Sequence, residues 1–261
     1  MFNWKSSEKI VNKDIFVWFS CGAASAVAAK IILDLYGDKN NIKILNNPIK
    51  EEHHDNKRFL QDLQSYLNHT IISVTNPDFP EQSAQEVWER KKFMSGVYGA
   101  PCTTLLKKRA RQFYERDNNC DFIVMGFTSE EQKRVVNFRN SELIPLLTPL
   151  LDNNMTKVSC ADFLISEGLK LPEIYKLGFP NANCIGCVKA SSPTYWNHVR
   201  KTFPDVFESR LETEEKLGSK LVIRKGKRIT LKELSPHDKG RSMKSLKSIE
   251  CGVLCSTEDI I

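Results

Sequence analysis

Long hydrophobic runs are missing from this sequence, and none approaches the roughly 18 residues that a membrane-spanning helix needs. The first residues are followed by no apolar segment of the kind that signal peptides contain. Internal repeats and low-complexity tracts are also missing, so a repeat architecture is not expected. We therefore expect a cytoplasmic protein that contacts no membrane. Its self-association into a homo-oligomer stays open.

Length and composition favour a packed core, because 41% of the 261 residues are hydrophobic. This size fits one large α/β domain, or a domain of about 200 residues with an appendage. The net charge of +6 is concentrated in residues 219–250, which hold ten Lys or Arg and three Asp or Glu. This basic segment is either a contact for a phosphorylated ligand or nucleic acid, or a solvated tail.

Short apolar runs alternate with helical segments along the first half of the chain. Strands are predicted at 15–19, 42–45, 70–75 and 121–125, and helices at 23–35, 55–67, 82–93 and 103–116. This alternation predicts βαβ units and an α/β fold with a doubly wound, mostly parallel sheet, whose ligands bind beyond the carboxyl ends of the strands. Further helices are predicted at 156–168 and 193–217, and a β-hairpin at 221–231. The chain is expected to have three parts: an α/β core (1–150), a helical part (151–218), and a basic hairpin with a flexible tail from Ser235 (219–261).

The segment Ser20-Cys21-Gly22-Ala23-Ala24-Ser25 lies between the first predicted strand and the first predicted helix. Small residues there let the backbone approach a ligand, and a helix N-terminus offers N–H groups to an anion. The hydroxyl groups of Ser20 and Ser25 add two further donors. The segment therefore predicts a phosphate-binding loop, with an ordinary tight turn as the alternative.

Eight cysteines are present, and the reducing cytoplasm makes a disulfide framework unexpected, which leaves metal-binding, redox and nucleophilic roles. Cys184 and Cys187 form a C-x-x-C motif, which can bind one metal ion or iron–sulfur cluster or act as a dithiol pair. Cys102 precedes the basic helix, where a thiol has a lowered pKa. Cys120 and Cys160 lie at apolar boundaries and are expected to be core cysteines.

The loop resembles the PP-loop of the adenine-nucleotide α-hydrolase superfamily, Ser-Gly-Gly-x-Asp-Ser. Ser20, Gly22 and Ser25 match, whereas Cys21 stands at a Gly and Ala24 at the Asp. Members that cleave ATP keep this Asp, while the phosphoadenylyl-sulfate (PAPS) reductase family, which the chain resembles together with its phage-type relatives, lacks it. The resemblance implies an adenine-nucleotide α-hydrolase-like fold. It also implies nucleotide contacts by Ser20, Gly22, Ala23, Ser25, Gly126, Arg134 and Arg139.

The cysteine pattern resembles that of iron–sulfur sulfonucleotide reductases, in which a Cys-Cys pair precedes Arg-Lys and a C-x-x-C follows. Here Cys102 and Cys184 are 82 residues apart, and the second cysteine of the pair is missing. The resemblance implies a [4Fe-4S] cluster held by Cys102, Cys184 and Cys187. Zinc or a dithiol stays open.

Near the end of the chain, Glu250-Cys251-Gly252 resembles the Glu-Cys-Gly-Leu-His motif of PAPS and adenylyl-sulfate (APS) reductases, with Cys255 at the His. The resemblance implies that Cys251 attacks the sulfonucleotide sulfur, that Cys255 is a resolving thiol or a fourth cluster ligand, and that thioredoxin or glutaredoxin donates electrons. The sequence thus predicts a PAPS or APS reductase. The alternative is a PP-loop sulfurtransferase that thiolates tRNA or another nucleic acid, with the basic segment as its contact.

Overall fold

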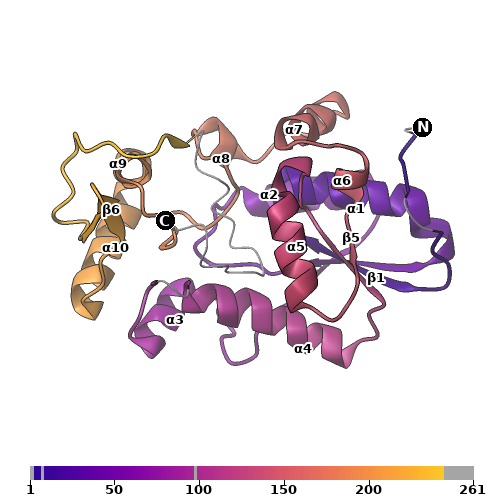
Figure 1. The fold of residues 1–261 in the computed structure, drawn as a ribbon, viewed down its shortest axis with the longest axis horizontal. Coiled ribbons are helices and arrows are strands. Elements are labelled where there is room, and N and C mark those ends of the chain that lie inside the picture. Colours follow the sequence, from indigo (N-terminus) through magenta and orange to yellow (C-terminus); the bar gives the residue numbers. More distant parts are fainter. Residues whose placement is uncertain (1–2, 7–8, 97–98, 244–261) are drawn as a thin grey trace. The chain divides into compact units, whose positions relative to one another are not determined.

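The computed structural model describes residues 3–6, 9–96 and 99–243 (Figure 1). The chain divides into two compact units, each built from segments that are separated in the sequence. Unit 1 holds the residues up to Pro48 together with His54–Val74 and Arg111–Glu173. Unit 2 holds Ile49–His53, Thr75–Ala110 and the residues from Ile174 onward. The division into the blocks 1–150, 151–218 and 219–261 stays a prediction.

Unit 1 contains a five-stranded parallel sheet in the order β3-β2-β1-β4-β5. The strands are β1 (Asp14–Phe19), β2 (Asn41–Asn46), β3 (Ile71–Ser73), β4 (Phe122–Met125) and β5 (Leu146–Leu147). The α/β class and the parallel sheet that the sequence predicts are confirmed. The two-residue β5 was not predicted, because so short a strand leaves no pattern.

The central strand β1 is apolar because both of its faces are covered. Phe16 and Trp18 contact the ring of Tyr114, at centroid distances of 5.6 and 6.4 Å. Phe19 points to the opposite face, where its ring lies 6.0 Å from that of Phe59. Successive side chains of a strand alternate between faces, so one continuous apolar run supplies two layers of core.

Helices therefore cover both faces of the sheet. Right-handed crossovers place α1 (Ala23–Tyr36) and α2 (Asn56–Leu67) on one face, and α4 (Ala110–Asp117) and α5 (Gln132–Ser141) on the other. Two further helices, α6 (Pro149–Asp152) and α7 (Lys157–Ser166), contact α1. Short 3₁₀ turns occupy Gly37–Lys39 and Ser129–Glu131. Strand order reverses between β1 and β4, so the loops that follow these strands flank the switch point of the sheet.

Unit 2 is mainly helical. Its elements are α3 (Ala84–Lys91), a π-helix (Thr103–Arg109), α8 (Glu173–Lys176, which begins at the last residue of unit 1), α9 (Pro193–Thr202), α10 (Pro204–Leu217), and the hairpin of β6 (Val222–Arg224) and β7 (Lys227–Ile229). Helix α9 contacts both α10 and β6, and the three lie together in Figure 1. The predicted hairpin and helical C-terminal part are confirmed.

The structure corrects two expectations and adds a helix that was not expected. The helix expected over 193–217 is two helices, because Pro204 cannot continue a helix and keeps Phe203 out of the helical region at φ −138° and ψ 69°. Helix α5 was not predicted, since only Val135 and Phe138 of its ten residues are buried. Residues 235–241 were expected to begin a flexible tail, yet Asn197 donates hydrogen bonds to the carbonyl oxygens of Ser235 and Asp238.

Among the residues that the structure describes, no helix has both the length and the apolar character needed to cross a membrane.

Candidate functional site

The loop between β1 and α1 is closed by a buried serine. The hydroxyl of Ser25 accepts a hydrogen bond from the backbone N–H of Ser20 at 3.1 Å and donates one to the carbonyl oxygen of Gly22 at 3.0 Å. Ser25 is only 3% exposed, whereas Ser20 is exposed. Ser25 was expected to offer its hydroxyl to a ligand, but in the structure this group joins the two ends of the loop.

Cys21 has the backbone conformation of a glycine. Its φ of +57° lies in the left-handed region, which costs roughly 1–2 kcal/mol for a residue with a Cβ. Asn46, at the carboxyl end of β2, is 2% exposed and supports this conformation. Its side-chain amide donates to the carbonyl oxygen of Phe19 at 2.8 Å and lies 3.5 Å from the sulfur of Cys21. The loop therefore keeps a glycine-type shape although a cysteine stands in it.

The N-terminus of α1 faces this loop without a side-chain cap. Gly22 is its N-cap residue, in an extended conformation with φ −105° and ψ 157°, and the first turn holds no acidic residue. A helix start of this kind, built from small residues and lacking a carboxylate, favours an anion because of its N–H groups and the helix dipole.

Gly126, directly after β4, touches the same loop. A Cβ atom built on Gly126 would lie 2.6 Å from the backbone nitrogen and 2.7 Å from the Cα of Ser25. Only a residue without a side chain permits this approach. The loop after β4 thus lies close against the first turn of α1 at the switch point, where doubly wound sheets bind their ligands.

The three predicted ligand cysteines lie in unit 2, in one hydrophobic core. Cys102, Cys184 and Cys187 are 9%, 9% and 4% exposed and belong to the same buried cluster. Thiolates buried among apolar side chains are typical of iron–sulfur sites, where burial tunes the reduction potential.

The backbone of the C-x-x-C loop is held on two sides. Cys184 forms a bridge with Glu52, and the N–H of Ile185 donates to the carbonyl oxygen of Glu51 at 2.9 Å. On the other side, the N–H of Cys187 donates to the hydroxyl oxygen of Tyr195 at 2.9 Å. Gly186 turns the loop at φ +62°, so both cysteines start from a fixed backbone.

Cys102 immediately precedes the π-helix, a rare conformation that is frequent at functional sites. Of the cations that follow Cys102, Lys107 is 9% exposed and forms an ion pair with Glu52 at 3.1 Å. Arg111, in unit 1, forms ion pairs with Glu115 and Glu142 at 2.5 and 2.7 Å. These two cations therefore have carboxylate partners, which weakens the expectation that they activate Cys102.

Three buried cysteines form a donor set that suits a thiolate-bound metal ion or an iron–sulfur cluster. Cys102, Cys184 and Cys187 would hold such a group.

No family model matches the chain, and no curated protein matches it. Among solved structures, it is similar to phosphoadenylyl-sulfate reductase from Candida auris in a phosphate complex, with 10% identity and a TM-score of 0.45 over 65% of this chain and 80% of that chain. It is similar to the U34-tRNA thiolase from Methanococcus maripaludis with its [4Fe-4S] cluster, with 11% identity and a TM-score of 0.45 over 79% of this chain and 70% of that chain. A third similar structure, a predicted tRNA methyltransferase subunit from Methanocaldococcus jannaschii, has 16% identity and a TM-score of 0.34 over 66% and 94%. These are low-identity likenesses of the backbone, and the fold assignment rests on the strand order of the sheet itself.

The remaining predicted site residues do not all lie at this loop. Ala23 is buried as the first residue of α1. Arg134 forms an ion pair with Glu131, and its guanidinium lies 4.9 Å from the ring centroid of Phe127. Arg139 is exposed in the last turn of α5, about 10 Å of helix beyond the first residue of α5. The predicted nucleophile Cys251 and its neighbour Cys255 lie outside the described residues. Their roles, like those of the two arginines, stay predictions.

Cys120 and Cys160 have the properties of core cysteines. Cys160 is fully buried and Cys120 is partly buried. Burial raises the pKa of both thiols to about 12, so neither forms a thiolate near neutral pH.

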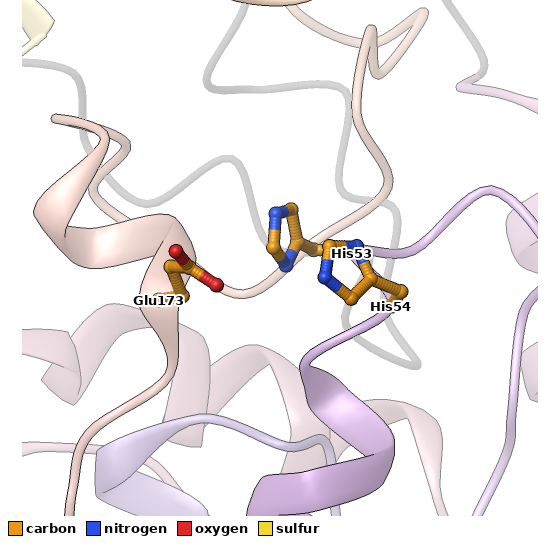
Figure 2. Close-up of side chains that lie close together, drawn as sticks. All are labelled: His53, His54 and Glu173. Carbon is orange, nitrogen blue, oxygen red and sulfur yellow. The ribbon is translucent and has the colours of Figure 1, made fainter.

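A histidine and a glutamate also lie close together in unit 1. Figure 2 shows His54 and Glu173, whose ligand atoms lie within 4.8 Å of one another. Both side chains are exposed, and the backbone N–H of Glu173 donates to the carboxylate of Asp55 at 2.7 Å. The preceding residue, His53, belongs to unit 2. Two exposed ligands from unit 1 are too few to define a metal site.

Sequence reasoning missed two residues, Asn46 and Arg210. Asn46 ends an apolar strand, and a polar residue at that place is a signal for a ligand edge. Arg210 lies in α10 on the buried face that also holds Phe207, Thr213 and Glu214. A charged residue at helical spacing from the apolar Phe207 is the signal that would have found it.

Proposed function

We propose that this chain binds an adenine nucleotide at the carboxyl edge of β1 and β4 and performs cysteine-based sulfur chemistry on it, as a PAPS or APS reductase. The observation that carries this proposal is the close approach of Gly126 to the backbone of Ser25, since it brings the loop after β4 against the first turn of α1 at the switch point of the sheet. An ordinary tight turn after β1 needs no such contact with a second loop.

The composition of the loop supports a sulfonucleotide over ATP cleavage. Ala24 stands at the place where the resembling PP-loop has an aspartate, so the first turn of α1 has no carboxylate for a metal-bound pyrophosphate. The uncapped helix start still favours phosphate groups. A sulfonucleotide already carries its sulfonate, so it needs a helix start that favours phosphate groups and does not need a carboxylate that binds a metal ion.

The proposed reaction uses the thiolate of Cys251. It attacks the sulfur atom of the sulfonucleotide, the bond between that sulfur and the phosphate oxygen breaks, and the nucleotide leaves. A dithiol donor such as thioredoxin or glutaredoxin then attacks the Cys251 sulfur and releases sulfite. Its second thiol closes the donor disulfide and restores Cys251, so two electrons pass from the donor to the sulfonate. Cys102, Cys184 and Cys187 would hold a [4Fe-4S] cluster, whose charge would tune the electrostatics of the protein.

Trapping the sulfonated enzyme tests this reaction. The reduced protein is incubated with PAPS or APS, and tryptic peptides are weighed. The peptide that holds Cys251 should gain the mass of one sulfonate. Cys251→Ser should abolish the gain without changing the affinity for the product nucleotide, while Cys120→Ala should keep it. An unmodified Cys251 peptide with both substrates would refute the reductase, even if nucleotide binding is intact.

A second candidate, thiolation of a nucleic acid, is favoured by the exposed basic tip of the hairpin. Lys225, Lys227 and Arg228 are all exposed there. Filter binding of tRNA over a salt series measures their contribution, and replacement of all three by glutamine should reduce the slope of log affinity against log salt by about 3. A triple variant with an unchanged slope would rule out this tip as the contact.

A further inference from the structure

Arg210 is a buried arginine whose contacts are all neutral. It is 4% exposed. Its Nε atom donates to the carbonyl oxygen of Gly186 at 3.3 Å, and a terminal nitrogen donates to the side-chain oxygen of Gln85 at 3.4 Å. The guanidinium also lies 4.7 Å from the ring centroid of Trp88. No carboxylate within the described ranges forms an ion pair with it.

The other buried arginine of the described chain, in contrast, has carboxylate partners. Arg111 is 0% exposed and forms ion pairs with Glu115 and Glu142. A guanidinium keeps its proton in a protein, so burying one without an anion is costly. The direct contacts of Arg210 are neutral, so an anion close to its guanidinium would compensate the buried charge.

The place of Arg210 indicates which anion this is. Gly186 is the residue between the two cysteines of the C-x-x-C motif, and a Cβ built on it would lie 3.3 Å from the Cγ of Arg210. The arginine thus contacts the loop through both its aliphatic stem and its Nε. Burial lowers the pKa of Arg210, and the charges that oppose this are, in order of size, those of Glu51, Cys184, Tyr195 and Cys187.

One carboxylate, that of Glu51, also opposes the lowering of the Arg210 pKa. Its oxygens accept hydrogen bonds from the hydroxyl of Ser83 at 2.8 Å and from the N–H groups of Ala84 and Gln85 at 2.8 and 3.0 Å. Glu51 therefore stabilises the start of α3. The cysteines of the C-x-x-C loop are the remaining acidic groups beside the guanidinium in the described structure, apart from the phenol of Tyr195.

We propose that Arg210 is the counter-ion of a thiolate-bound iron–sulfur cluster at Cys184 and Cys187. The inference rests on the cluster of the proposed function and adds the residue that compensates its charge. Thiolates bound to iron stay negative, and a cation fixed beside them stabilises both their ligation and the reduced, more negative state of the cluster. Arg210 is a positioning residue in this role, since it acts through the loop and its charge.

Iron content and reduction potential test the proposal on protein purified and reconstituted without oxygen. Arg210→Met removes the charge and keeps a similar stem. We expect its affinity for the cluster, measured by competition with an iron chelator, to fall about 10- to 100-fold. We also expect the reduction potential of the remaining cluster to become more negative. Arg210→Lys should restore much of both properties, because it keeps the charge.

Two further variants keep the test decisive. Arg200→Met removes another arginine of unit 2, one that bonds to the carbonyl oxygens of Leu231 and Leu234, and should leave the potential unchanged. If Arg210→Met does not fold, Arg210→Gln, which is neutral but can still donate to Gly186, should show the same two losses.

The possible failures are distinguishable from one another. A folded neutral variant with wild-type iron retention and potential would overturn the role of Arg210, while the cluster would stand. Wild-type protein that retains no iron after reconstitution would overturn the cluster and Arg210 together. Nucleotide affinity, measured on the same samples, reports separately on the loop after β1.

Discussion

Alanine at position 126 would place a methyl group where the loop after β4 meets the first turn of α1. The added Cβ would lie 2.6 Å from the nitrogen and 2.7 Å from the Cα of Ser25. Nonbonded heavy atoms normally lie about 3.5 Å apart, so the overlap is about 0.8–0.9 Å. Both crowded groups are backbone, and no side-chain rotation relieves the contact. The two loops must therefore move apart.

The size of the effect follows from this overlap. Overpacking of a well-packed site costs about 1–3 kcal/mol, and in a protein of this size each kcal/mol lowers the melting temperature by about 2–4 °C. If nucleotide binding requires the original contact, the same 1–3 kcal/mol is lost from binding, which weakens affinity about 5- to 150-fold. Gly126→Ala should therefore melt earlier and bind more weakly.

Calorimetry with adenosine 3′,5′-bisphosphate, AMP and ATP measures this loss, and thermal unfolding is recorded on the same samples. Gly37→Ala is the matched control, because Gly37 has a helical φ of −56° and an added Cβ meets nothing within 4 Å. It should bind as the wild type does. If Gly126→Ala is destabilised but binds nucleotide with unchanged affinity, the contact between the two loops is structural only, and the reasoning that places the nucleotide there is wrong.

Three other perturbations have definite expected outcomes. Asn46→Ala leaves the carbonyl oxygen of Phe19 and the left-handed Cys21 unsupported, so urea unfolding should show a loss of about 1–3 kcal/mol and calorimetry a weaker nucleotide affinity; unaltered stability would contradict this. Gly186→Ala should lose more stability and iron than Gly218→Ala, because both have a positive φ but only the first would crowd α10; equal losses would contradict the contact. Burial raises the pKa of Glu214, so the folded protein favours the protonated carboxyl. The stability gained from this protonation should be complete below the ordinary glutamate pKa and should decline as pH rises through the raised value. Glu214→Gln should flatten this part of the pH profile of urea midpoints, and a profile identical to that of the wild type would refute the reasoning.

Local patterns were sufficient to predict the sheet and the loop after β1. The strand at 15–19 and the helix at 23–35 differ sharply in composition, and the three small residues Ser20, Cys21 and Gly22 separate them. The two-residue β5 and the charged α5 have too little apolar pattern to be seen. The end of α9 before Pro204 could have been predicted from the sequence, since the residue before a proline avoids the helical region.

The site was harder to predict than the fold, because its main contacts join distant parts of the chain. Gly126 was expected at the nucleotide by resemblance, but only the three-dimensional structure shows that it touches Ser25. Asn46 and Arg210 act on the loops that contain Cys21 and Gly186, from 25 and 24 positions away in the sequence. No periodic pattern within either segment encodes these partners.

The two departures of the loop from the PP-loop pattern have different physical consequences. Cys21 adopts the φ that a glycine would have, and Asn46 supports it, so the shape of the loop is kept. Ala24 removes a carboxylate from the first turn of α1, where a negative charge would repel phosphate groups unless a divalent cation lay between them. Under the proposed function, a loop that keeps its shape and lacks this carboxylate would bind an anionic nucleotide without cleaving a metal-bound pyrophosphate. The proposal therefore places the reactive group among the cysteines rather than at the phosphate chain.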